Sequence, residues 1–205
     1  MILPIAPCSH QTANILVVYG TTEGHTCKIA QRIEGFVRQL GYNAEVVDSA
    51  DVQEDFHTEG FNACIVLGSL HQGHHQRSLV HFVRKYRDNL RRGPSAFLSA
   101  SLTVAYNEGD HHAELQKCVD DFIGETEWLP TEWTSVAGAL MFVEYDWFKR
   151  MILKSISKKA GRDTDTSKDY EYTDWVALEE YVAKEFHLRQ GACLKGRLTH
   201  AAYGH

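Results

Sequence analysis

Short apolar runs alternate with segments of helical periodicity along most of the chain. Five runs have the length, the apolar content and the flanking turn residues of strands. They are Asn14–Gly20, Asn43–Asp48, Ala63–Ser69, Pro94–Leu102 and Thr134–Phe142. Apolar side chains recur every three or four positions in other segments, which predicts helices over 24–41, 77–90, 111–126 and 174–186.

This alternation predicts an α/β fold with a five-stranded parallel sheet and helices on both of its faces. We expect one domain over 14–188, an N-terminal extension over 1–13 and a C-terminal tail over 189–205. Ligands of such sheets bind where loops leave the carboxyl ends of the strands. The loops after the first, third, fourth and fifth strands are therefore the candidate site.

Composition and charge narrow the class of protein. The formal net charge is -6 and the pI is near 6.0, which argues against a nucleic-acid partner. No apolar run is long enough to span a membrane, and the N-terminus lacks the basic start of a signal peptide. The five cysteines are scattered and form no CxxC motif, so we expect reduced thiols in a cytoplasmic protein.

The loop after the first strand, "GTTEGHT" over 20–26, suits a phosphate group. Backbone N–H groups at a helix start and the hydroxyls of Thr21, Thr22 and Thr26 can donate to it, and Gly24 allows close approach. The loop matches neither the nucleotide-triphosphate nor the dinucleotide glycine pattern. A monophosphate ligand fits better, although the loop could instead simply cap the helix through Thr22 or Glu23.

This loop resembles the phosphate loop of the flavodoxin family, with Thr21, Gly24, His25 and Thr26 matching its pattern and Glu23 standing where threonine is usual. The resemblance implies a flavodoxin-like fold and FMN as cofactor. It further implies that the loops after strands three and four flank the flavin ring. The implied FMN contacts are Thr21, Thr22, Glu23, Gly24, His25, Thr26, Ser69, Leu70, His71, Gly73, His74, Ser99, Ala100 and Leu102.

Several histidines lie in these flavin-flanking loops. His71 and His74 could donate to the flavin edge or relay protons, and they could equally be exposed polar loop residues. With His75, His111 and His112 they could also converge on a metal. No cysteine or well-placed carboxylate completes a recognisable ligand set, so we expect no metal.

A basic amphipathic segment, expected as an insertion over about 144–173, follows the fifth strand. A helix begun at Asp146 places Trp147, Phe148, Met151, Ile152 and Ile156 on one side. Six basic residues and no acid lie between Trp147 and Arg162, namely Lys149, Arg150, Lys154, Lys158, Lys159 and Arg162. The helix could pack on the domain, dock on a membrane or partner, or form one wall of a pocket for an apolar polycarboxylate.

The segment from Gly138 onward resembles the menaquinone-dependent protoporphyrinogen oxidases of bacterial haem synthesis. It has the Gly-Ala-Leu sequence, the Trp-containing basic insertion, Thr-Asp-Thr at 164–166 and Tyr-Thr-Asp-Trp at 172–175. The loop at Gly73 departs from this family, which has an arginine and an aromatic there. The loop after the fourth strand, "AYNEGDHH", is acidic where the family tends to be basic.

This second resemblance implies an FMN enzyme that oxidises protoporphyrinogen IX and passes electrons to menaquinone or another quinone. It implies further FMN contacts at Thr164, Asp165 and Thr166. Residues implied for substrate or membrane contact are Trp147, Phe148, Lys149, Arg150, Met151, Lys154 and Lys158. The protein would then be peripheral on the inner face of the cell membrane, and a homo-oligomer is compatible with it. The alternatives are a flavodoxin-like electron carrier, a quinone reductase with another donor, or a flavin-free interaction module.

Overall fold

A five-stranded parallel sheet forms the centre of the molecule. The computed structural model describes residues 13–22, 24–101, 112–137, 139–140, 170–171 and 173–188 of the chain. The sheet has the order β2-β1-β3-β4-β5, which is the flavodoxin-like order. Its strands are β1 Asn14–Gly20, β2 Asn43–Asp48, β3 Ala63–Ser69, β4 Ser95–Ser101 and β5 Glu132–Ala137. The fold class predicted from the sequence is therefore confirmed.

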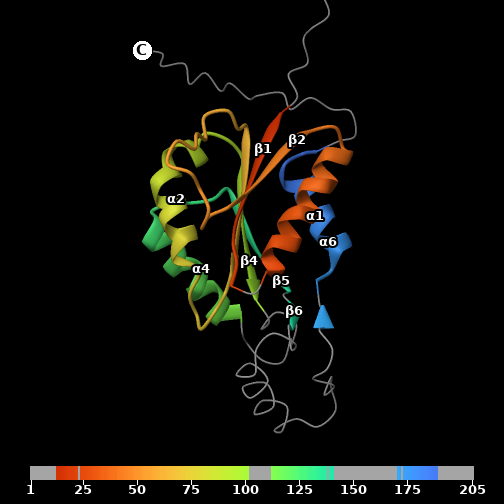
Figure 1. The fold of residues 1–205 in the computed structure, drawn as a ribbon. Helices are drawn as coiled ribbons and strands as arrows, with labels where there is room; N and C mark the ends of the chain where they lie inside the picture. The colour runs from red at the N-terminus through yellow and green to blue at the C-terminus, as the bar shows by residue number, and fades with distance from the viewer. Residues whose placement is uncertain are drawn as a thin grey trace, which may run out of the picture.

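Helices cover both faces of this sheet (Figure 1). Helices α1, His25–Gln39, and α6, Trp175–Glu185, lie on one face. Helices α2, Arg77–Leu90, and α4, His112–Thr126, lie on the other, each within two residues of its expected bounds. None of the helices in these described ranges is long and apolar enough to cross a membrane.

Two apolar layers pack between the sheet and the helices. Side chains alternate along β1, so Ile15 and Val17 join the layer under α1 and α6, while Leu16 and Val18 join the layer under α2 and α4. All four are completely buried, as expected for a central parallel strand covered on both faces. This burial fixes the register of β1 against β2 and β3, because a one-residue slip would exchange the two faces.

The end of the fifth strand differs from the sequence expectation of Thr134–Phe142. Strand β5 starts earlier, at Glu132, and pairs with β4 as far as Ala137. Ala139 and Leu140 form a separate strand, β6, which pairs antiparallel with β7, Tyr170–Glu171. One continuous apolar run covers both β5 and β6, although the two strands belong to different sheets. Periodicity alone therefore does not show where β5 ends.

A buried hydrogen-bond chain ties this second sheet to the main fold. The hydroxyl of Thr173 donates to the carbonyl oxygen of Ala137 at 2.8 Å, and Nε2 of His25 lies 2.8 Å from the same hydroxyl oxygen. Because Thr173 has one hydroxyl proton, Nε2 of His25 must be the donor in the second bond. The next residue, Asp174, accepts from the backbone N–H of Ala177 at 3.0 Å and caps α6.

A second buried histidine, His75, packs against the opposite face of the sheet. Its ring lies 5.1 Å from the rings of both Phe97 and Phe122, and its Nε2 lies 3.0 Å from the hydroxyl of Ser99. The ring also crosses β3 at Gly68, where an added Cβ would lie 2.7 Å from its Cδ2. Burial, with a smaller contribution from His74, lowers the pKa of His75 to about 4, so the ring is neutral in the folded protein.

We expect Thr173→Val to lower the free energy of unfolding by about 1–3 kcal/mol. The valine removes one hydroxyl and leaves two buried partners, His25 Nε2 and the Ala137 carbonyl, without it. Urea unfolding followed by circular dichroism measures the change. Thr173→Ser keeps the hydroxyl and should restore most of the loss; a valine variant as stable as the parent would contradict the role given to this chain of bonds.

The neutral state of His75 makes stability depend on pH. Its pKa is lower in the folded protein, about 4, than its ordinary value of 6.5, so the unfolded chain binds more protons between these values. The stabilisation that comes from the neutral His75 ring is therefore fully present above about pH 6.5, and it decreases as the pH is lowered toward 4. The proton uptake of His75 on unfolding should make the free energy of unfolding about 2 kcal/mol lower at pH 5 than at pH 7.5.

The test compares urea unfolding of the parent and His75→Leu at pH 7.5 and pH 5. The variant should lose about 2 kcal/mol less than the parent over this interval, whatever its absolute stability. His57→Gln, which replaces an exposed histidine, serves as the control. If the free energy of unfolding changes equally in the parent and in His75→Leu between pH 7.5 and pH 5, His75 is not the cause of the pH dependence.

Candidate functional site

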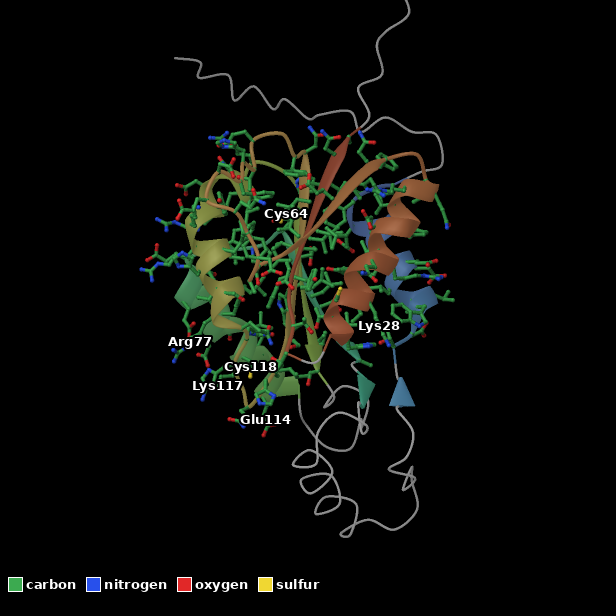
Figure 2. All side chains as sticks on the ribbon, viewed as in Figure 1. Lys28, Cys64, Arg77, Glu114, Lys117 and Cys118 are labelled. Carbon is green, nitrogen blue, oxygen red and sulfur yellow. The ribbon has the colours of Figure 1, made fainter. Side chains whose placement is uncertain are left out.

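The carboxyl ends of all five parallel strands meet at one edge of the sheet. Figure 2 shows this edge toward the bottom, where α1, α2 and α4 begin and where Arg77, Glu114, Lys117 and Cys118 project beside α2 and α4. Lys28 lies at the same end, on the α1 side. Parallel topology therefore brings together the loops after β1 and β3, as the sequence predicted.

The loop after β1 turns directly into the N-terminus of α1. Gly24 has φ +79° at the N-cap, and an added Cβ there would meet no atom within 4 Å, so the backbone is open to a ligand. The hydroxyl of Thr21 accepts from the backbone N–H of Gly24 at 2.9 Å. Its own proton remains available, and the first N–H groups of α1 have no partner within the helix. Together these donors have the chemistry to hold an anion.

Of the two side chains that could cap α1, Thr22 lies among the described residues and bonds to Gln76 instead, while Glu23 lies outside them. No described side chain makes a cap hydrogen bond at the start of α1, and the Thr21 hydroxyl closes the loop itself. The hydroxyl of Thr22 is exposed and accepts from the side chain of Gln76 at 2.9 Å. Among the described residues of this loop, the bonds to Thr21 and Thr22 hold its shape without a side-chain acceptor on the N–H groups that follow Gly24.

Gln76, which the sequence analysis missed, connects three parts of this edge. Its Nε2 donates to Thr22 after β1 and, at 2.5 Å, to the hydroxyl of Ser69 at the end of β3. Gln76 is itself the N-cap of α2, although its side chain makes no cap bond there. Its position just before a predicted helix was the one available signal, and it does not indicate the distant partners.

The loop after β3 forms a tight two-residue turn. His71 and His74 exchange backbone hydrogen bonds of 2.9 and 3.0 Å across Gln72 and Gly73. Both central residues have positive φ, 52° and 82°, as a type I′ turn requires. The backbone N–H of Leu70 donates to the carbonyl of Ala100 at 2.8 Å and anchors the turn to β4. His71, Gly73 and His74 are therefore held on a short, well-defined projection.

A cavity of about 430 Å³ lies between this turn and α4. Its walls combine imidazoles, one guanidinium, two carboxylates and a thiol. They are formed by Thr22, His71, Gly73, His74, His75, Gln76, Arg77, Val80, Cys118, Asp121, Phe122 and Glu125. The predicted residues Thr22, His71, Gly73 and His74 thus share one concave surface.

Two further groups near the edge are held neutral. A hydrogen bond with Cys27, followed by burial and the carboxylate of Asp48, raises the pKa of Tyr19 well above its ordinary value. Burial, with the charge of Asp121, raises the pKa of the Cys118 thiol. Neither group adds negative charge beside the anion site, and Cys118 lacks the thiolate character of a nucleophile.

Other predicted residues are placed away from an open surface. The side chain of His25 is engaged by Thr173, and Thr26 is 1% exposed in the first turn of α1. Ser99 is 0% exposed and bonded to His75, while Ala100 lies in the apolar layer under α1 and α6. The backbone N–H groups of His25 and Thr26 still lie at the helix start, but the Ser99 and Ala100 side chains point into the core.

The remaining predicted contacts lie outside the described residues. They are Glu23, Leu102, Trp147, Phe148, Lys149, Arg150, Met151, Lys154, Lys158, Thr164, Asp165 and Thr166. For the alternative of a metal site, His111 also falls outside them, and no group of three or more His, Cys, Asp or Glu suited to a metal occurs within the described ranges.

Comparison with known proteins gives relatives over nearly the whole chain. Protoporphyrinogen IX dehydrogenase (quinone) of Escherichia coli strain K12 is 29% identical over 180 residues, which cover 88% of this chain and 98% of the relative. The protein of the same name from Leishmania major is also 29% identical, over 84% of this chain and 74% of the relative.

A solved structure and a family model were also found to be similar to this chain. The oxidised flavodoxin 1 of Bacillus cereus is 15% identical, with a TM-score of 0.46 over 71% of this chain and 96% of that one. The family model described as a flavodoxin domain matches residues 16–167, which contain most of β1, all of β2 to β5 and the phosphate loop. Because this match covers well over half of the chain, the protein belongs to the flavodoxin domain family.

Proposed function

We propose that this protein binds FMN at the carboxyl edge of the sheet and oxidises protoporphyrinogen IX to protoporphyrin IX, with a quinone as electron acceptor. Two independent features support the proposal. The loop between β1 and α1 is built to hold a phosphate, and the similarity to proteins named protoporphyrinogen IX dehydrogenase (quinone) extends over 88% of the chain. The second feature carries the choice of substrate.

The residues of the edge fit the phosphate of FMN. Open backbone at Gly24, the Thr21 hydroxyl and the N-terminus of α1 offer donors to an anion without a carboxylate among the described loop residues. Membership of the flavodoxin domain family indicates FMN as the phosphate-bearing ligand. The turn at 71–74 then lies beside the flavin ring.

The chain supplies positioning and the flavin supplies redox chemistry. FMN, when bound, accepts electrons in two-electron steps. Thr21 and the first N–H groups of α1 hold its phosphate, and the turn from His71 to His74 limits where the ring can lie. His71 and His74 line the adjoining cavity, where their imidazole nitrogens can take protons that the porphyrinogen releases.

The insertion places this reaction near a membrane in our proposal. The acceptor is menaquinone or a related quinone, the protein is cytoplasmic, and it lies at the inner face of the cell membrane in haem biosynthesis. The basic and apolar composition of 146–162 supports this, because each basic residue near an anionic surface contributes about 1 kcal/mol. Trp147, Lys149 and Arg150 would contact lipid headgroups or the propionates of the substrate.

The purified protein should be yellow, and its released flavin should be FMN. Mixed anaerobically with protoporphyrinogen IX and a soluble menaquinone analogue, it should produce fluorescent protoporphyrin and reduced quinone together. The same protein stripped of flavin is the control and should regain both activities when FMN is added back.

The outcomes separate the proposal from its alternatives. FMN binding without porphyrin formation or quinone reduction would favour a flavodoxin-like electron carrier. Quinone reduction with a different donor would indicate a quinone reductase. A colourless protein that takes up no FMN would contradict both redox functions, and the flavin-free interaction module would be the remaining alternative.

We expect Trp147→Ser combined with Met151→Ser to weaken binding to vesicles rich in phosphatidylglycerol by at least about tenfold, because two large apolar side chains no longer enter the interface. FMN content should not change. Leu129→Ser removes an apolar side chain that is 69% exposed outside the insertion and is the matched control. Vesicle sedimentation measures the effect, and equal binding of both variants would remove the membrane contact of the insertion from the proposal.

A further inference from the structure

The half-buried side-chain amide of Gln76 determines the direction of two hydrogen bonds at the edge of the sheet. Nε2 of Gln76 lies 2.9 Å from the Thr22 hydroxyl oxygen and 2.5 Å from the Ser69 hydroxyl oxygen. A primary amide nitrogen carries two protons and is a donor only. Both hydroxyl oxygens therefore accept from Gln76, and neither hydroxyl donates its own proton in this contact.

The two hydroxyls are consequently available as donors. Within the part of the chain that the structure describes, Thr22 and Ser69 make no other side-chain hydrogen bond. A hydroxyl that already accepts a bond from an amide points its proton elsewhere, and here both residues stand at the carboxyl edge. Phosphate and flavin carbonyl oxygens are acceptors, so hydroxyls fixed as donors complement them.

This arrangement has a cost within the protein. Oε1 of Gln76 is buried and has no hydrogen-bond partner among the described residues. An unsatisfied buried carbonyl costs about 5- to 150-fold in a folding or binding equilibrium, a penalty that native structures rarely accept without a reason. The side chain of Gln76 lies against Gly20, where an added Cβ would come within 3.1 Å of Oε1.

We infer that Gln76 is a positioning residue, which orients the hydroxyls of Thr22 and Ser69 as donors toward the bound flavin nucleotide. The inference rests on the proposed FMN binding and adds a residue through which that binding is tuned. Thr22 serves the phosphate end, since it lies in the loop between β1 and α1. Ser69, at the end of β3, serves the flavin side.

The inference predicts that Gln76→Met weakens FMN binding about three- to tenfold, the range of one or two net hydrogen bonds. Riboflavin lacks the phosphate and should lose less, so the ratio of FMN to riboflavin affinity should fall. Flavin fluorescence titration of the stripped protein gives both dissociation constants without any turnover. Gln39→Met, an exposed glutamine at the far end of α1, is the control and should change neither.

A double-mutant cycle separates orientation from general support of the fold. In a Thr22→Val background the hydroxyl is absent, so Gln76→Met should cost FMN binding clearly less than in the parent. Gln76→Glu keeps the shape but can only accept, so both hydroxyls turn inward, and riboflavin affinity should also fall. This second variant remains informative if the methionine variant does not fold.

The results can overturn the inference without touching the proposed function. If the parent binds FMN and Gln76→Met leaves the ratio of FMN to riboflavin affinity unchanged, Gln76 does not orient the phosphate donor. Additive losses in the cycle with Thr22→Val, or riboflavin binding by Gln76→Glu equal to that of the parent, would have the same meaning. A parent protein that binds no FMN would instead overturn both proposals together.

Discussion

The parallel pairing of β1 with both β2 and β3 is the constraint on which the rest of the molecule depends. A central strand with completely buried side chains on both faces cannot change register, so its carboxyl end lies at a fixed point of the edge. The loop to α1 starts from that point, and β3 ends beside it. The bonds of Gln76 to Thr22 and Ser69 connect these two neighbouring strand ends.

Hydrogen-bond direction gives the edge its chemical character. Thr21 accepts from a backbone N–H, while Thr22 and Ser69 accept from the Gln76 amide. The three hydroxyls thus present protons rather than lone pairs, and the α1 N-terminus adds N–H groups of the same polarity. An acceptor-rich ligand is favoured without a fixed positive charge in the described loop, because these dipoles are already oriented before it arrives.

Much of the fold follows from local pattern, while the site depends on distant contacts. The helices and four of the strands could be predicted closely because each has one continuous periodic signal. The end of β5 could not, since Ala137 and Ala139 belong to different sheets within one apolar run. Adjacent His74 and His75 look alike in sequence, yet one is exposed on a turn and the other is buried between phenylalanine rings. Gln76 acts on a residue 54 positions away, which no local pattern shows.

The short ladder of β6 and β7 has a consequence for the evolution of the fold. Together with the Thr173 hydroxyl it brings the two ends of the intervening chain to one point beside β5. The entropy of closing such a loop grows only with the logarithm of its length, by about 0.6 kcal/mol for each doubling. Segments of very different size and chemistry could therefore replace one another between β6 and β7 while the sheet and the phosphate loop remain intact. The flavodoxin-like sheet could in this way accept a different segment between β6 and β7 without a change in its own packing.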